Sequence, residues 1–265
     1  MIKTRMPSLD YKSKPADIFL IAGGPQSKNT KAILAEVLKS SKKKAPSVAY
    51  IGTASSDNKE FFLMLSQILM TAGAGNVTLV PIVRRFDPAK SRNILLSSDV
   101  VFISGGDVDL GMKYLRKRNL IPFFRELYQV GKLFCGISAG AILLCRNWMH
   151  WRDPDDDGTV ELLDCLGFAP LLCDVHDEED DWMEIKRLLG FFPQGTVGYG
   201  IPAEGALRVS PNGKIASLGS ASVRFIKKAN TISISKNNAA ERRRLRKLTN
   251  LPNPPFSPFI KGGNF

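Results

Sequence analysis

The chain has 265 residues, of which 44% are hydrophobic and 23% are charged. This composition is typical of a globular protein and excludes disorder over most of the chain. No apolar run approaches the ~20 residues that a membrane helix needs, and the first apolar stretch is too short for the core of a signal peptide. We therefore expect a cytoplasmic protein.

The formal net charge of +12 suggests a polyanion partner at first, so its distribution matters. Residues 1–14 hold four basic and one acidic residue, and residues 236–265 hold seven basic and one acidic residue. The intervening 15–235 carry 26 basic and 23 acidic residues, a net charge of only +3. We divide the chain accordingly into a basic N-terminal extension (1–14), a main domain (15–235) and a basic, proline-rich tail (236–265) that we expect to be disordered.

Short apolar runs alternate with amphipathic stretches in the first half of the main domain. Runs rich in β-branched or aromatic residues predict buried strands at 17–22, 47–53, 76–81, 99–104 and 132–136. Apolar residues at three- and four-residue spacing predict helices at 30–41, 59–72 and 108–118. This alternation predicts a doubly wound, mostly parallel α/β sheet flanked by helices, in which ligands bind at the carboxyl ends of the strands.

The second half of the main domain is less regular. A polar loop at 153–157 and an acidic run at 177–181 precede a helical stretch that reaches about residue 189. Short strand-like segments with turn signals between them follow at 195–201, 205–210, 214–218, 222–226 and 231–235.

The strongest chemical signal lies at 132–144, where an apolar strand runs through Gly136-Ile137-Ser138-Ala139-Gly140 into an apolar helix. This is G-x-S-x-G in its strand–turn–helix context, in which a strained turn lifts the serine hydroxyl above the sheet. The alternative is a glycine-rich turn in an ordinary βα unit.

A serine nucleophile needs a base, most often histidine, and this chain has only two histidines. His150 follows Ser138 by 12 residues and is expected beyond the far end of the serine's helix, as a packed or surface residue. His176 follows a strand-like run at 169–175, which places it at a strand's carboxyl end, and we favour it as the base.

The acid that would orient the histidine has many candidates, because carboxylates crowd the segment after His176. The candidates are Asp174, Asp177, Glu178, Glu179, Asp180, Asp181, Glu184 and Glu204. The acidic run is most simply a solvated loop. Glu204 stands alone between two strand-like segments, and the residues leave open whether it is functional or a turn residue.

Two further glycine turns and the four cysteines are weaker candidates for a chemical role. Gly105 and Gly106 follow a predicted strand, and an amide there could join the amide of Ala139 as an oxyanion hole. Taken alone, however, the glycine pair is better explained by an ordinary βα turn. Gly23-Gly24-Pro25 lacks the dinucleotide-binding spacing. The cysteines form no CxxC pair and are expected as buried free thiols: Cys135, Cys145, Cys165 and Cys173. A catalytic Cys135 is a lesser alternative, since it lies on the predicted strand.

Four motifs in order resemble the peptidase S51 family, whose members include dipeptidase E and cyanophycinase. They are ISGGD (103–107), GISAGA (136–141), DVH with its acidic run (174–181) and GYGIPAEGA (198–206). The resemblance spans about 16–220 and implies a glutamine-amidotransferase-like fold, a Ser–His–Glu triad and a catalytic role for the main domain. Carried onto this chain, the triad is Ser138, His176 and Glu204, and the oxyanion donors are the amides of Gly106 and Ala139.

Two departures from the family pattern bear on the substrate. The glycine pair is followed by Asp107-Val108, where the family often has Asn-Thr, and residues 177–181 are acidic where cyanophycinases are rich in arginine. The resemblance therefore favours a dipeptidase E-like enzyme that cleaves short peptides, with N-terminal Asp-X peptides implied by the named relatives alone. No metal or organic cofactor is expected, and no membrane partner.

Three alternatives remain open at this point: a non-catalytic binding protein with the same fold, a cyanophycinase-like exopeptidase, and nucleic-acid binding through 242–247. No aromatic residue is interleaved with that basic run, which favours a solvated tail over a nucleic-acid site. The sequence gives no indication of the oligomeric state.

Overall fold

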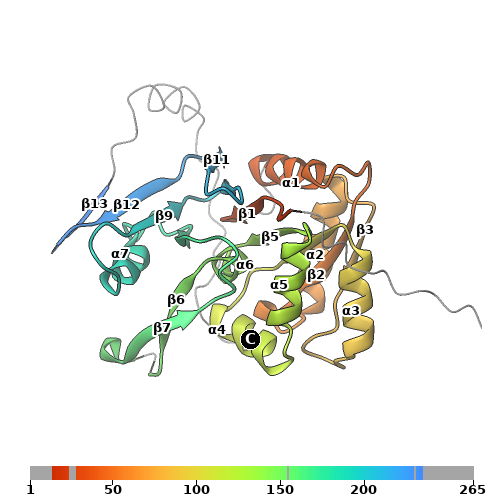
Figure 1. Ribbon diagram of the computed structural model, residues 1–265, viewed down its shortest axis with the longest axis horizontal. Helices are drawn as coiled ribbons and strands as arrows, with labels where there is room; N and C mark the ends of the chain where they lie inside the picture. The colour runs from red at the N-terminus through yellow and green to blue at the C-terminus, as the bar shows by residue number, and fades with distance from the viewer. Residues whose placement is uncertain (1–13, 24–27, 154, 230, 235–265) are drawn as a thin grey trace, which may run out of the picture.

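A seven-stranded sheet forms the centre of the protein in a computed structural model that describes residues 14–23, 28–153, 155–229 and 231–234 (Figure 1). The strand order is β11-β10-β1-β5-β4-β2-β3. The five strands β1 to β5 run parallel, whereas β10 is antiparallel to both β1 and β11. The strands are β1 (Ile18–Ile21), β2 (Ser47–Ile51), β3 (Asn76–Leu79), β4 (Val100–Ile103), β5 (Leu133–Ile137), β10 (Gly205–Val209) and β11 (Ile215–Gly219).

Helices cover both faces of this sheet, and the alternation of side chains along β1 shows how. Ile18 and Leu20 belong to the core beneath α4, α5 and α6, whereas Phe19 and Ile21 belong to the core beneath α1 and α2. Because both faces are buried, the strands read as continuous apolar runs. The predicted doubly wound, mostly parallel α/β fold is confirmed. The helices are α1 (Lys28–Ser40), α2 (Lys59–Thr71), α3 (Pro88–Ser97), α4 (Val108–Lys117), α5 (Ile121–Gln129) and α6 (Ala139–Leu144), with a short 3₁₀ turn η1 (Thr53–Ser55) after β2.

A second, smaller sheet was not expected from the sequence. It has the order β13-β12-β9-β8, with β8 (Leu172–Val175), β9 (Val197–Ile201), β12 (Val223–Lys227) and β13 (Ile232–Ile234). β8 and β9 are parallel and are joined through α7 (Met183–Gly190), which packs on them. A Cβ at Gly198 would come within 3.0 Å of Ile185, and a Cβ at Gly200 would come within 3.0 Å of Trp182. The two glycines therefore let the α7 region lie close to the sheet.

The strand-like segments of the second half therefore divide between two sheets. β10 and β11 extend the main sheet, while β9, β12 and β13 belong to the second one. A separate hairpin, β6 (Asn147–Trp151) and β7 (Val160–Asp164), includes the 3₁₀ turn η2 (Asp157–Thr159) and leads toward β8. The loop from β9 to β10 crosses from one sheet to the other, and it contains Glu204.

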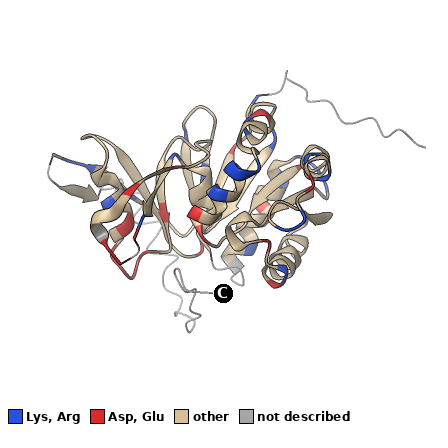
Figure 2. Cartoon of the chain, turned by 90° about the horizontal axis from the view of Figure 1, so that it is seen from below, with Lys and Arg blue, Asp and Glu red and all other residues tan. Residues whose placement is uncertain are grey.

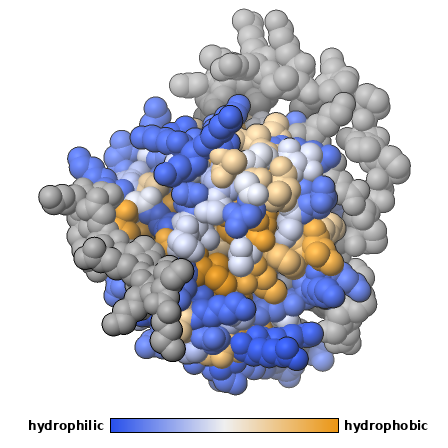
Figure 3. All heavy atoms as spheres, turned by 90° about the vertical axis from the view of Figure 1, so that its right-hand side faces the viewer, coloured by the Kyte–Doolittle hydropathy of each residue, from blue (hydrophilic) through white to orange (hydrophobic). Residues whose placement is uncertain are grey.

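Charges of both signs are distributed over the described helices and loops (Figure 2). The face at the β3 edge of the main sheet shows polar side chains around an apolar area (Figure 3). Among the described residues, no helix is long and apolar enough to cross a membrane. The prediction of a disordered tail concerns 236–265, which lie outside the described residues, as do residues 1–13 of the N-terminal extension.

Candidate active site

The G-x-S-x-G segment forms a sharp turn at the carboxyl end of β5, a central strand of the main sheet. β5 ends at Ile137 and α6 begins at Ala139, so Ser138 alone makes the turn, with φ 53° and ψ −125°. The Ser138 amide donates to the carbonyl of Ile21 at the end of β1, at 2.8 Å. Between residues 133 and 145, Ser138 is the one residue that is not buried. The turn therefore presents this side chain and buries its neighbours.

Close backbone packing leaves no room for a side chain at either glycine of the motif. A Cβ at Gly136 would lie 2.1 Å from the Gly140 carbonyl oxygen, and a Cβ at Gly140 would lie 2.1 Å from the Ile103 carbonyl oxygen. Such distances are far below van der Waals contact, so only glycine allows α6 to pack this closely on β5 and β4. This close packing fixes the position of the Ser138 turn.

His176 meets Ser138 from the second sheet. It directly follows β8, its amide donates to the Ile201 carbonyl at 2.9 Å, and its backbone is left-handed with φ 45°. The imidazole Nε2 lies 2.9 Å from the Ser138 Oγ, which is hydrogen-bond distance. Gly23, after β1, lies beside the imidazole, since a Cβ there would be 3.5 Å from His176 Cδ2. The structure therefore joins the predicted nucleophile and the predicted base, 38 residues apart in the chain.

The glycine pair after β4 borders the same turn. A Cβ at Gly105 would be 3.0 Å from Ser138 Cβ and 3.6 Å from its Oγ. Gly106 has φ +136°, and a Cβ there would lie 2.1 Å from the Ala54 carbonyl oxygen. This loop is held by a hydrogen bond from the Asp107 amide to the same carbonyl, at 2.9 Å. Oxyanion binding by the amides of Gly106 and Ala139 stays a prediction; Ala139 directly follows Ser138, and Gly106 directly follows Gly105, which lies against Ser138.

Glu204 lies in the loop from β9 to β10, half-buried and left-handed with φ 61°. Its backbone is tied to β11 by the Ser220 amide, which donates to the Glu204 carbonyl at 3.3 Å. The same loop is tied to the His176 loop, because the Ala203 amide donates to Glu178 Oε1 at 2.6 Å. Sequence reasoning placed Glu178 in a solvated run and missed this contact. The role of Glu204 as the acid that orients His176 stays a prediction.

The disfavoured candidates His150 and Cys135 have other surroundings. His150 lies beyond the end of the serine's helix, as expected: α6 ends at Leu144, and His150 is on β6 with its Nδ1 3.0 Å from Asp109 Oδ1. Cys135 is buried within β5, and burial raises the pKa of its thiol, so it is a poor nucleophile. All four cysteines are free thiols; Cys135, Cys145 and Cys173 are buried, as expected, whereas Cys165 is only half-buried. The Sγ atoms of Cys145 and Cys173 are 3.1 Å apart.

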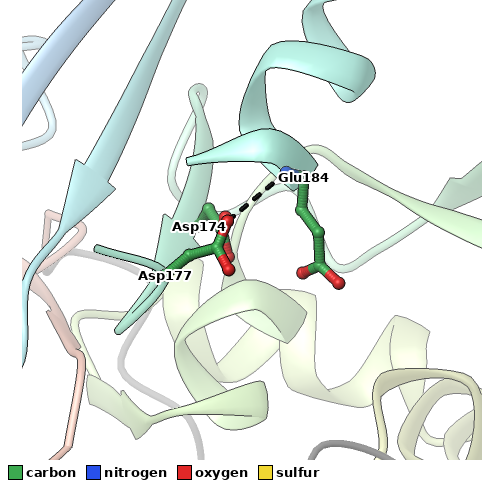
Figure 4. A group of neighbouring side chains, drawn as sticks. All are labelled: Asp174, Asp177 and Glu184. Carbon is green, nitrogen blue, oxygen red and sulfur yellow. Dashed lines mark hydrogen bonds between the residues drawn. The ribbon is translucent and has the colours of Figure 1, made fainter. Parts of the chain in front are cut away.

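One group of side chains among the described residues has a composition suited to a metal ion: Asp174, Asp177 and Glu184 (Figure 4). It adjoins His176 in the chain but is separate from the Ser138–His176 hydrogen bond.

A serine hydroxyl bonded to an imidazole, in a strained turn at the carboxyl end of a parallel strand, is the arrangement from which serine hydrolases build their nucleophile. The chain belongs to peptidase family S51, whose family model matches residues 18–216. The resemblance seen in the four sequence motifs is thereby confirmed.

Individual relatives agree with this assignment. An uncharacterised peptidase, YgaJ, from Bacillus subtilis (strain 168) is 27% identical over 149 residues, which make up 55% of this chain and 61% of that protein. The match thus spans less than two thirds of the relative's length.

Two solved structures share the fold. A peptidase from an acI-B1 Actinobacterium superposes with a TM-score of 0.67 at 17% identity, over 85% of this chain and 96% of the other. A candidate peptidase E protein from Listeria monocytogenes EGD-e superposes with a TM-score of 0.58 at 16% identity, over 78% of this chain and 100% of the other. At these identities the likeness concerns the fold.

Proposed function

We propose that this protein is a serine peptidase that hydrolyses short peptides through Ser138, His176 and Glu204. The observation that carries the proposal is the 2.9 Å contact between Ser138 Oγ and His176 Nε2. It supplies the nucleophile–base pair that acyl transfer needs. Membership of a peptidase family indicates the amide bond as the bond that is cleaved.

In the proposed reaction His176 accepts the proton of the Ser138 hydroxyl as Oγ attacks the scissile carbonyl. The amides of Gly106 and Ala139 stabilise the oxyanion, and loss of one such donor typically costs about 3 kcal/mol of barrier. His176 then gives the proton to the leaving amine, and Glu204 holds the imidazole in the required tautomer. Water hydrolyses the acyl-enzyme, with His176 again as the base.

The strained backbone of Ser138 supports this role. A non-glycine residue at φ 53° and ψ −125° costs of order 1–3 kcal/mol and persists only where the surroundings impose it. Here the Ile21 carbonyl and the packing of Gly136 and Gly140 impose it. An ordinary βα turn would not require this conformation.

The family and the acidic run both bear on the substrate preference. Residues 177–181 are acidic where cyanophycinases are rich in arginine, so we favour dipeptide hydrolysis of the dipeptidase E type over cyanophycin cleavage. A screen of a dipeptide library that includes Asp-X members would determine the preference. Cleavage of cyanophycin without any hydrolysis of dipeptides would show that the proposed preference for dipeptides is wrong.

The decisive test compares the wild type with Ser138→Ala. We expect a fluorophosphonate probe to label the wild type at Ser138, and Ser138→Ala to lower dipeptide hydrolysis at least about 10³-fold. Glu204→Gln is expected to lower kcat at least about 10²-fold while the protein stays folded. A folded wild type that is neither labelled nor active would instead support a non-catalytic binding protein. Undiminished hydrolysis by Ser138→Ala would refute the mechanism.

A further inference from the structure

The peptide bond between Gly105 and Gly106 carries the amide that the proposed mechanism uses as an oxyanion donor. It lies beside the nucleophile, because a Cβ at Gly105 would be 3.6 Å from Ser138 Oγ. The Gly106 amide donates no hydrogen bond to any described residue, so it is available to a ligand. The orientation of this one peptide plane therefore decides whether the amide faces the reacting carbonyl.

Ser104 holds the opposite side of that peptide plane. Its Oγ donates to the Gly105 carbonyl at 3.2 Å. In a trans peptide the carbonyl of one residue and the amide of the next lie in one plane and point in opposite directions. A hydroxyl that fixes the Gly105 oxygen therefore also fixes the direction of the Gly106 N–H.

Glycine on both sides of the peptide makes this hydrogen bond more important. Neither residue has a Cβ, and Gly106 has φ +136°, so the clashes that normally oppose rotation of a peptide plane are weakened. After Gly106 the loop is held by the Asp107 amide, which donates to the Ala54 carbonyl at 2.9 Å. The Ser104 hydroxyl is the corresponding contact before it.

The Ser104 hydroxyl is itself held in a buried position. Ser104 is 0% exposed, and its amide donates to the Ile51 carbonyl at 3.0 Å. Its Oγ lies 3.3 Å from the Oγ of Ser55, a residue of η1. A hydroxyl has one proton and two acceptor sites, so Ser104 can accept from Ser55 while it donates to Gly105. These contacts join the ends of β2 and β4 and restrict the rotation of the Ser104 side chain.

We propose that Ser104 is a positioning residue of the active site, whose hydroxyl orients the Gly106 amide toward the oxyanion. The proposal rests on the proposed function, because the oxyanion forms only if Ser138 attacks a carbonyl. Ser104 acts through the Gly105–Gly106 peptide and not on the substrate. Its effect is largest in the transition state, where negative charge develops on the oxygen, so it changes kcat and leaves KM nearly constant.

The experiment compares Ser104→Ala with Ser91→Ala. Ser91 is also 0% exposed, and its Oγ donates to the Pro81 carbonyl at 3.1 Å, but it lies on α3. Both changes remove a buried hydroxyl that is bonded to a backbone carbonyl, so both should lower the melting temperature by about 2–4 °C. Ser104→Ala alone should lower kcat for dipeptides about 10- to 100-fold, with KM within about twofold of the wild-type value.

Two further measurements separate the hydrogen bond from packing. The tetrahedral fluorophosphonate adduct also places an oxygen in the oxyanion position, so Ser104→Ala should slow labelling of Ser138 by a factor similar to the loss of kcat. Ser104→Cys keeps a similar side-chain shape and replaces the hydroxyl with a weaker donor. Its kcat should lie between those of the wild type and Ser104→Ala.

Three results would overturn the role of Ser104 while the proposed function stands. In an active wild-type background, they are equal kcat values for Ser104→Ala and Ser91→Ala, a loss carried by KM alone, and a kcat of Ser104→Cys at or below that of Ser104→Ala. The last result would show that side-chain volume matters and the hydrogen bond does not. A folded wild type that is neither labelled nor active would instead remove the proposed function and this role together.

Discussion

At the scale of single residues, the site depends on backbone positions that only one residue type tolerates. Gly106 is the clearest case, because its φ is +136° and a Cβ would lie 2.1 Å from the Ala54 carbonyl oxygen. Ala54 belongs to η1 after β2, so this contact fixes the loop after β4 against a neighbouring strand end. The amide predicted to bind the oxyanion is held by the same contact.

We expect Gly106→Ala to destabilise the protein by at least about 3 kcal/mol, because strain and overlap with backbone add together. Gly213→Ala is the matched control: Gly213 has φ +82° and nothing within 4 Å of its Cβ position, so it should cost only about 1 kcal/mol. Urea denaturation of both variants measures the difference. Equal losses would show that Gly106 is not under steric constraint.

Asp57 allows a prediction about pH, because burial raises the pKa of its carboxyl against the opposing hydrogen bonds from Val83 and Arg84. A carboxyl whose folded-state pKa exceeds its unfolded value binds its proton more tightly when folded. Its contribution to stability is present at low pH and is lost as pH rises from about 4 through the folded pKa.

Asp57→Asn should therefore lessen the decline of unfolding free energy as pH rises through this window. Asparagine tolerates the left-handed φ of 52° and can still accept the Val83 hydrogen bond through its amide oxygen. Denaturant midpoints at a series of pH values test this. A variant whose midpoints run parallel to those of the wild type would contradict the assignment of the slope to Asp57.

The sequence singled out Ser138 and His176, whose side chains are in contact, where the chain offered few choices, and their catalytic roles stay proposals. His176 could be identified because the chain has only two histidines, and Ser138 could be identified because it lies in a strand–turn–helix motif. Glu178 could not be found this way. Its contact with Ala203 joins segments 25 residues apart, and nothing in the acidic run distinguishes it from Glu179 beside it.

At the scale of elements, the site is assembled where two sheets meet. Ser138 follows β5 of the main sheet, His176 follows β8 of the second sheet, and the β9–β10 loop with Glu204 crosses between them. The Glu178–Ala203 hydrogen bond couples that loop to the His176 loop. We expect Glu178 to act as a positioning residue.

Glu178→Ala should lower kcat about three- to thirtyfold with little change in KM, since it loosens the geometry without touching substrate. Glu178→Gln keeps an oxygen that can accept from the Ala203 amide and should restore most of the rate. Glu179→Ala, its exposed neighbour, is the control. Equal losses in the Gln and Ala variants would mean that charge, and not this hydrogen bond, matters.

Strands β1, β2, β4 and β5 were predictable because they are apolar on both faces, whereas β3 is a partly exposed edge strand. Each expected run contains most or all of its observed strand. Helices α3 and α5 were missed. They are short, α3 depends on local capping by Asp87 and Pro88, and α5 has a proline in its first turn. Strand-like segments were expected where the second sheet lies, but their grouping into a separate sheet was missed, because β8, β9 and β12 pair across long separations that local patterns do not encode.

At the scale of the whole molecule, the excess positive charge lies outside the family-matched region. Residues 236–265 contribute six of the twelve net charges, whereas residues 15–235 contribute three. The match to the peptidase family ends at residue 216. On the described helices and loops, positions with basic and with acidic residues are both present (Figure 2). Polyanion binding and peptide hydrolysis should therefore be separable.

Deletion of 236–265 should leave kcat/KM for dipeptides within about twofold of the wild-type value. It should also lower the salt concentration needed for elution from heparin, because affinity for polyanions depends on the number of cationic contacts. The untruncated Ser138→Ala protein is the reciprocal control and should be retained like the wild type while lacking activity. Salt-sensitive DNA binding that survives the deletion would place a polyanion site on the peptidase-like body. Loss of activity on deletion would instead show that the tail contributes to the catalytic site.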